Sequence, residues 1–189
     1  MNDIVFYWSA WASWIWAAWI MDKGKIRTRT VFFSLIAIIC SNHTFSIAGY
    51  TVNMTVLFFL FLSVFFILKK PFSKQIYLMI IGGETALGYA SILLLSSFDP
   101  VLFILPVNVL TTIFLLCISY IVTNQPADKL FLVFFSTTVG EIIVGIIFGN
   151  LHLHYEIGMN GYLTRISLPF LIIAILSTLK TMVMKNKFV

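Results

Sequence analysis

The sequence predicts an all-α fold: a polytopic transmembrane helix bundle with seven spans, the N-terminus outside and the C-terminus inside. Three observations define the class. Hydrophobic residues make up 60% of the 189 residues and charged residues only 10%, whereas a soluble chain is about 25% charged. No water-soluble fold hides so much apolar surface. The third observation is that short polar or basic connections separate the apolar runs.

A single transmembrane domain is expected to cover residues 1–189. The first run contains all five tryptophans. No positive charge precedes it and no small-residue cleavage site follows it, so we expect an anchor rather than a cleaved signal peptide. The second run is the weakest, because polar residues interrupt its outer part. The predicted spans are residues 4–21, 31–47, 54–68, 75–95, 101–122, 130–149 and 166–184.

Basic residues give the expected orientation. If the first basic connection is cytoplasmic and the spans alternate, all of the 12 basic residues except Arg165 fall on the cytoplasmic side. Such an excess of Lys and Arg is typical of cytoplasmic loops. The same clustering argues against a nucleic-acid-binding surface, although the net charge is +5, because short clusters between apolar runs do not form one basic face. The bilayer is therefore the first expected partner.

Two acidic residues, Glu84 and Glu141, lie far from any predicted membrane surface. A charged group at the bilayer centre costs about 2.5–3.5 kcal/mol on insertion scales, so such residues are rare and often functional. Each lies in a Gly-Glu-x-x-x-Gly pattern, and glycine lets a neighbouring backbone approach closely. The predicted helix-packing glycines are Gly82, Gly83, Gly88, Gly140, Gly145 and Gly149.

The two glutamates are expected to face the bundle interior, where each needs a polar neighbour on another span. The candidate intramembrane polar site consists of Glu84, Glu141, Asn108 and His43. Further candidate donors at matching depth are Thr111, Ser91 and Tyr89. Two alternatives remain open. The carboxyls serve a proton-coupled transporter or a polar-ligand pocket, or they only hold helices together.

The sequence around Glu84 and Glu141 also suggests an internal repeat. The span after each glutamate carries Leu-Pro near its start, at Pro106 and at Pro169. Two parallel pairs of spans related by an axis along the membrane normal would give this pattern. Pro106, lying past the first turn of its predicted span, is expected to kink that helix.

The last long connection contains a weak metal-binding candidate. If this segment is extended, His152, His154 and Glu156 share one face and can converge on a metal ion. Histidine and tyrosine also suit a membrane interface, which is the simpler interpretation. No enzyme motif and no cofactor-binding pattern is present in the sequence, so we expect neither catalysis nor a cofactor.

The tryptophan-rich first span runs into Asp22-Lys23-Gly24-Lys25-Ile26-Arg27-Thr28-Arg29. Together with the small size and the number of spans, this stretch resembles the YphA-type family of Gram-positive membrane proteins. The resemblance implies a multi-pass protein of the cytoplasmic membrane of a Bacillus-like bacterium. It carries no activity and no functional residues over to this chain.

The sequence therefore favours a non-enzymatic integral membrane protein. The first hypothesis is a small proton-coupled transporter or polar-ligand binder that uses paired glutamates. The second is a structural or interaction subunit of a membrane complex, with other membrane proteins as partners. The two hypotheses differ in whether water reaches the carboxyls, because a transporter needs a polar path to them and a structural subunit does not.

The orientation makes a direct prediction. A reporter fused after Val189 is expected to be active in the cytoplasm, and one fused before Met1 on the outer side, because basic loops stay inside. Paired alkaline phosphatase and fluorescent-protein fusions measure this. Finding both ends on one side would contradict the seven-span arrangement, with the second span as the first suspect.

Overall fold

The computed structural model describes residues 4–21, 23–47, 49–99, 101, 103–158 and 161–186. Within these ranges the chain forms seven α-helices, one π-helical turn and one β-hairpin. The elements are α1 (Ile4–Ile15), η1 (Trp16–Ile20), α2 (Lys25–Ser41), β1 (Thr44–Ile47), β2 (Tyr50–Asn53), α3 (Met54–Ile67), α4 (Phe72–Phe98), α5 (Val107–Val122), α6 (Pro126–Asn150) and α7 (Tyr162–Asn186).

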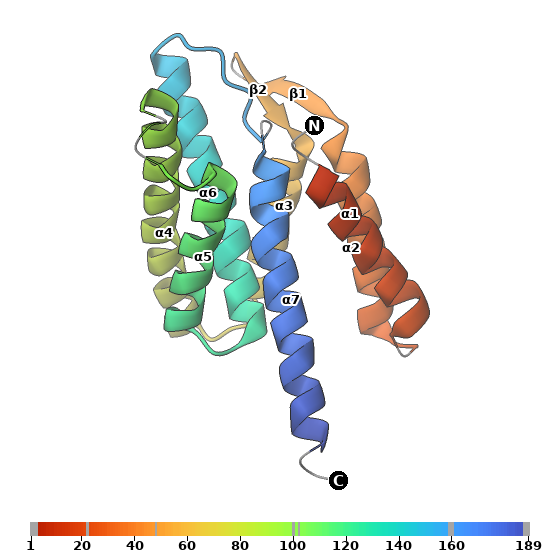
Figure 1. Ribbon diagram of the computed structural model, residues 1–189. Helices are drawn as coiled ribbons and strands as arrows, with labels where there is room; N and C mark the ends of the chain where they lie inside the picture. The colour runs from red at the N-terminus through yellow and green to blue at the C-terminus, as the bar shows by residue number, and fades with distance from the viewer. Residues whose placement is uncertain are drawn as a thin grey trace.

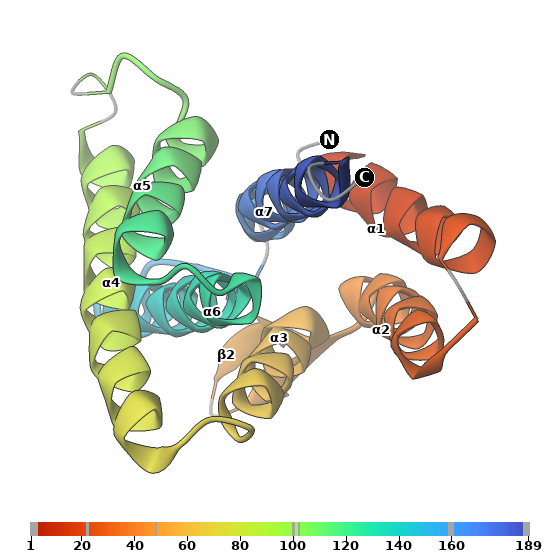
Figure 2. The same cartoon turned by 90° about the horizontal axis from the view of Figure 1, so that it is seen from below.

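The helices form an elongated bundle with α6 at its centre (Figure 1). Seen along the bundle, α6 lies among α3, α4, α5 and α7, and the α1–α2 pair stands to one side against α7 and α3 (Figure 2). Most residues of α6 are buried, which explains why its apolar character extends all round the helix. Because α6 is surrounded by other helices, a polar side chain on α6 can be buried within the bundle.

Close packing of α4 on α6 depends on glycine. A Cβ atom at Gly140 would lie 2.5 Å from Cδ1 of Tyr89 and 2.9 Å from the backbone oxygen of Ala86. On the facing helix, a Cβ atom at Gly82 would lie 2.7 Å from Cδ1 of Phe135. The Ser136 hydroxyl donates to the backbone oxygen of Gly82 at 3.2 Å, which ties the two helices together across this contact. The two helices therefore approach each other closely at Gly82 and Gly140.

Other glycines admit single aromatic or aliphatic side chains. A Cβ atom would collide with Phe114 at Gly88, with Ile157 at Gly145 and with Tyr50 at Gly149. Gly83 differs from these positions, because no atom lies within 4 Å of its would-be Cβ. Of the glycines expected to pack helices, Gly83 alone faces open space in the structure.

A charged cluster holds the lower end of the bundle in Figure 1. Asp128, in the first turn of α6, has a side chain that is only 1% exposed. Its carboxylate pairs with Lys70 at 2.7 Å and with Lys74 at 2.5 Å. Both lysines flank the connection from α3 to α4, so this cluster joins three helices. An acidic group also suits the first turn of a helix, where the dipole is positive.

The opposite end carries the β-hairpin, which corrects the predicted second span. Residues 44–47 form strand β1 rather than the end of a helix, and β1 pairs antiparallel with β2. The helix itself begins at Lys25, so the basic segment is helical and the apolar run starts one turn later. The Asn53 side chain accepts from the backbone nitrogen of Thr55 and starts α3 immediately after the hairpin.

The proposed kink is contradicted, and the positions of the two prolines and the two glutamates do not support the repeat. Pro106 lies just before the first residue of α5, where a proline removes no helical hydrogen bond. Pro169 lies inside α7, beyond its first turn. The two prolines therefore occupy different places in their helices. The glutamates differ as well, because Glu84 is exposed whereas Glu141 is buried.

Two of the described helices, α4 and α6, are long and apolar enough to cross a membrane by length and composition. Shorter apolar helices accompany them at Met54–Ile67, Val107–Val122 and Tyr162–Thr178. At 1.5 Å per residue, the 27 residues of α4 extend about 40 Å, more than a ~30 Å hydrocarbon core.

The α4–α6 contact predicts a contrast between two glycine substitutions. Gly140→Ala is expected to destabilise the protein by about 1–3 kcal/mol, because the new methyl group overlaps Tyr89 and the Ala86 carbonyl. Thermal unfolding in detergent measures the change. Gly83→Ala is the matched control, since its methyl group enters open space and alanine favours helix. Equal loss of stability in both variants would contradict the contact.

Candidate functional site

Glu141 is the centre of a buried polar cluster. It lies in the middle of α6 and is fully buried. Its Oε1 accepts a hydrogen bond from the Tyr155 hydroxyl at 2.7 Å, and its Oε2 accepts one from the Tyr89 hydroxyl at 3.1 Å. Nη2 of Arg165 lies 3.4 Å from both carboxylate oxygens. Three segments of the chain thus converge on one carboxylate.

Gly140 explains how Tyr89 reaches the carboxylate. The absence of a side chain on Gly140 lets the Tyr89 ring lie against the α6 backbone, one residue before Glu141. Tyr89 is completely buried, and Tyr89 was among the donors expected from depth. That expectation is confirmed by its hydrogen bond to Glu141. The glycine before the glutamate therefore serves the site as well as the helix contact.

Arg165 supplies the compensating charge. It lies in the first turn of α7 and its side chain is 7% exposed. The Arg165–Glu141 separation of 3.4 Å is longer than the 2.7–2.9 Å typical of a tight charged hydrogen bond. The Arg165 Nε is buried without a hydrogen-bond partner. The guanidinium therefore keeps donor capacity beyond its contact with Glu141.

Tyr155 comes from the connection between α6 and α7, and the hairpin positions it. Ile157 pairs with the edge of β2 at Val52: its nitrogen donates to Thr51 O at 2.9 Å, and its oxygen accepts from Asn53 N at 2.8 Å. The Tyr155 ring stacks on Phe148, with ring centroids 5.1 Å apart. Burial, and then the negative charge of Glu141, raises the pKa of the Tyr155 phenol well above its ordinary value. Tyr155 is therefore a neutral donor at every physiological pH.

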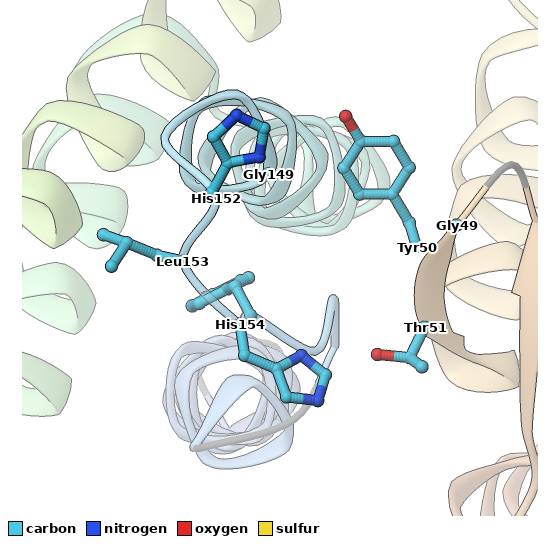
Figure 3. Close-up of a pocket in the computed structure, with 8 residues that line it drawn as sticks. Gly49, Tyr50, Thr51, Gly149, His152, Leu153 and His154 are labelled. Carbon is cyan, nitrogen blue, oxygen red and sulfur yellow. The ribbon is translucent and has the colours of Figure 1, made fainter.

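A cavity opens above this cluster. Its volume is about 440 Å³, and it lies between the hairpin and the start of the α6–α7 connection (Figure 3). Its lining is Gly49, Tyr50, Thr51, Gly149, His152, Leu153, His154 and Tyr155. Tyr155 thus belongs to both the cavity wall and the Glu141 cluster, and it is the one side chain that links them.

His152 lies at the end of α6 in a conformation usually reserved for glycine. Its φ is 56°, and it is the only non-glycine residue with positive φ in the described part of the chain. The His152 nitrogen donates to Gly149 O, and the Leu153 nitrogen donates to Phe148 O, both at 3.0 Å. These two bonds form a Schellman motif, in which glycine is preferred at the position of His152. A histidine there places an imidazole at the cavity at some cost in backbone strain.

Glu84 does not join the cluster, which corrects the expected glutamate pair. It is exposed on the outer face of α4, on the side away from Tyr89 and α6. Neither a hydrogen bond nor an ion pair reaches it from the described residues. The physical reason is helical periodicity: Tyr89 and Ala86 define the buried face of α4, and Glu84 lies on the opposite face.

The other two candidates of the polar site also lie elsewhere. His43 is exposed in the connection from α2 to β1. Asn108 is in the first turn of α5, with its side chain near Gly161 at the start of α7. The partners of Glu141 are Tyr89, Tyr155 and Arg165 instead.

The metal hypothesis is not supported by the geometry. It required residues 152–156 to be an extended strand, but this segment is an irregular connection after the end of α6. His152 and His154 both line the cavity, whereas Glu156 does not. Among the residues that the structure describes, no three His, Cys, Asp or Glu side chains are grouped to hold a metal ion.

The architecture is helical, and α4 and α6 are long and apolar enough to cross a membrane by length and composition. The chain belongs to the YphA-like integral membrane protein family, whose family model matches residues 2–188. This match covers nearly the whole chain and confirms the resemblance drawn from the first thirty residues. No curated protein and no solved structure matches the chain.

The cluster predicts strong coupling between its two charges. Arg165→Gln leaves a buried carboxylate without its counter-charge, and Glu141→Gln leaves a buried guanidinium; each is expected to cost about 3–5 kcal/mol. The double variant removes both charges and should cost clearly less than the sum of the two. Unfolding free energies in detergent give the coupling.

The matched control is the same cycle built with Glu84→Gln in place of Glu141→Gln. Because Glu84 does not contact Arg165, its effects should add to those of Arg165→Gln within about 0.5 kcal/mol. An additive Glu141–Arg165 cycle would show that the two charges do not depend on each other.

Proposed function

We propose that the chain is a non-catalytic, seven-span membrane protein that binds a small polar ligand in its outer cavity and couples binding to the protonation of Glu141. The observation that carries this proposal is the double role of Tyr155. Tyr155 is among the residues that line the cavity, and its hydroxyl donates to the buried carboxylate at 2.7 Å.

The lining of the cavity supports a polar ligand. Tyr50, Thr51, His152 and His154 supply hydroxyl and imidazole groups around a space of about 440 Å³, which lies in the range of small-molecule sites. A ligand that takes the hydrogen bond of the Tyr155 hydroxyl deprives Glu141 of one of its three partners. Binding in the cavity and the charge state of Glu141 are then linked.

Protonation of Glu141 completes the coupling. A neutral carboxyl no longer compensates Arg165, whose guanidinium already has an unbonded Nε. Arg165 then favours a ligand with an acidic group, because a buried cation requires an anionic partner. A proton on Glu141 and an anion near Arg165 together replace the original ion pair without a change in net charge. This exchange is the elementary step of a proton-coupled carrier.

The proposed orientation places the cavity outside a bacterial cytoplasmic membrane and the Asp128 cluster inside. Support comes from the excess of basic residues at the connections opposite the hairpin. The two ends of the described chain also lie toward opposite ends of the bundle in Figure 1.

A second candidate function is a structural subunit of a membrane complex. One observation favours it: Glu141, on α6, accepts hydrogen bonds from donors on α4, on α7 and in the α6–α7 connection. A cluster of this kind stabilises a bundle without any ligand. The two candidates differ in what happens when the charges are removed.

The test uses the full chain in liposomes that contain a pH-sensitive dye and are exposed to pools of polar metabolites. The expected result is proton movement with at least one pool, abolished by Glu141→Gln and weakened by Tyr155→Phe. Glu84→Gln is the matched control and should transport as the unmodified chain does, since Glu84 lies outside the cluster.

The apolar double variant Glu141→Leu with Arg165→Met separates the candidates. Replacing a buried ion pair by apolar side chains is often neutral or stabilising for the fold. We expect a folded protein that neither binds nor transports a ligand. If no pool moves protons or raises the thermal stability of the unmodified chain, the binding proposal fails and the structural candidate stands.

A further inference from the structure

A second cavity lies deep in the side of the bundle, between the α1–α2 pair and the helices α3, α6 and α7. Its volume is about 390 Å³. Five helices line it, and phenylalanine dominates the wall: Phe6, Phe33, Phe58, Phe59, Phe65 and Phe66 are examples. We call this space the lateral cleft. It is separate from the outer cavity, with which it shares no lining residue.

Three of the four serines that line the lateral cleft, Ser9, Ser34 and Ser167, do not call for a polar ligand. The Ser9 hydroxyl donates to the backbone oxygen of Phe6, and the Ser34 hydroxyl donates to that of Thr30. The Ser167 hydroxyl donates to the backbone oxygen of Thr164. Because each hydroxyl is satisfied by its own helix, these positions present an apolar wall. Protein interiors leave few empty spaces larger than a water molecule, so an apolar molecule suits this space.

One end of the cleft is basic. Arg29, early in α2, and Lys69, just after α3, both line it. The Lys69 Nζ lies 4.5 Å from the centre of the Phe65 ring, which is part of the same wall. Ion pairs among the described residues involve only Lys70, Lys74 and Arg165 as cations. No carboxylate of the described residues therefore neutralises Arg29 or Lys69, and an anion at this end of the cleft is attracted by both charges.

The length of the cleft matches one leaflet. Along α3 it extends from Phe58 to Lys69, which at 1.5 Å per residue is about 16 Å. Half of a hydrocarbon core of ~30 Å is about 15 Å. The basic end lies at the same end of the bundle as the α1–α2 and α3–α4 connections (Figure 1). A charged group there and an apolar chain above it occupy the depth of a single leaflet.

We propose that the lateral cleft binds an anionic phospholipid from the leaflet on the side of the basic connections. The phosphate lies between Arg29 and Lys69, and an acyl chain runs along the phenylalanine wall toward Phe6. This site does not depend on the proposed function of Glu141. The occupant is a lipid rather than free phosphate, because most of the space can only be filled by an apolar chain.

The test titrates the purified full chain with phosphatidylglycerol or phosphatidylcholine of identical chains and counts bound lipids by native mass spectrometry. We expect one tight binding site for phosphatidylglycerol and a lower affinity for phosphatidylcholine. The double variant Arg29→Gln with Lys69→Gln should weaken phosphatidylglycerol by about thirtyfold, about fivefold for each charge. The affinity of this variant for phosphatidylcholine should change little, since the phosphatidylcholine headgroup carries no net charge.

Two controls make the result decisive. Lys23→Gln with Lys25→Gln removes the same charge near the same connection without touching the cleft, and it should leave the tight site intact. Equal weakening by this pair would overturn the proposal in favour of a diffuse basic surface. If inorganic phosphate alone displaced the lipid, the proposal that the acyl chain contributes to binding would be overturned.

The acyl chain is tested by filling the cleft. Ser13→Phe and Ser34→Leu each add bulk to the cleft wall and should reduce binding of both lipids. Ala12→Phe is the matched control for the first, because Ala12 neighbours Ser13 in α1 but is exposed and outside the cleft. Thermal unfolding checks that each variant is folded. Unchanged binding by either folded cleft-filling variant would overturn the site.

Discussion

The ion pair between Glu141 and Arg165 is the interaction on which the rest of the structure depends. Both charges are buried in an apolar bundle, where either one alone is very unfavourable. Their neighbours serve the pair: Gly140 admits Tyr89, and the hairpin holds the α6–α7 connection so that Tyr155 reaches the carboxylate. The central position of α6 follows, because only a helix enclosed by others can keep a carboxylate away from lipid.

Each of the two cavities is lined by residues that belong to this cluster or follow it in sequence. Tyr155 forms the wall of the outer cavity, while Ile166 and Ser167, which follow Arg165 in α7, line the lateral cleft. The residues after Arg165 in α7 therefore line the apolar space, and Tyr155, a neighbour of Arg165 at Glu141, lines the polar one. A movement of α7 that loosened Arg165 from Glu141 would alter both spaces. If both proposed sites are occupied, this arrangement would link the lipid in the cleft to the ligand in the cavity through Arg165 and Glu141.

Much of the fold could be predicted from composition and charge, and the chemistry of the site only in part. Apolar runs predicted the helices, and depth predicted Glu141 and its donor Tyr89. The hairpin was missed because Thr44–Ile47 reads as the end of an apolar run. Glu84 was misplaced because the sequence around it resembles that around Glu141, and only packing decides which face of a helix is buried. Arg165 was missed as a partner, although it was the one basic residue on the wrong side of the expected topology, which was itself a signal of a buried counter-charge.

The same ion pair constrains how the chain is assembled in the bilayer. Glu141 and Arg165 lie 24 residues apart on consecutive helices. If α6 entered the membrane alone, it would carry an uncompensated carboxyl at a cost of about 2.5–3.5 kcal/mol. Entry of α6 and α7 as one helical hairpin lets the charges neutralise each other during insertion. Biogenesis would thereby favour release of this pair of helices from the translocon together.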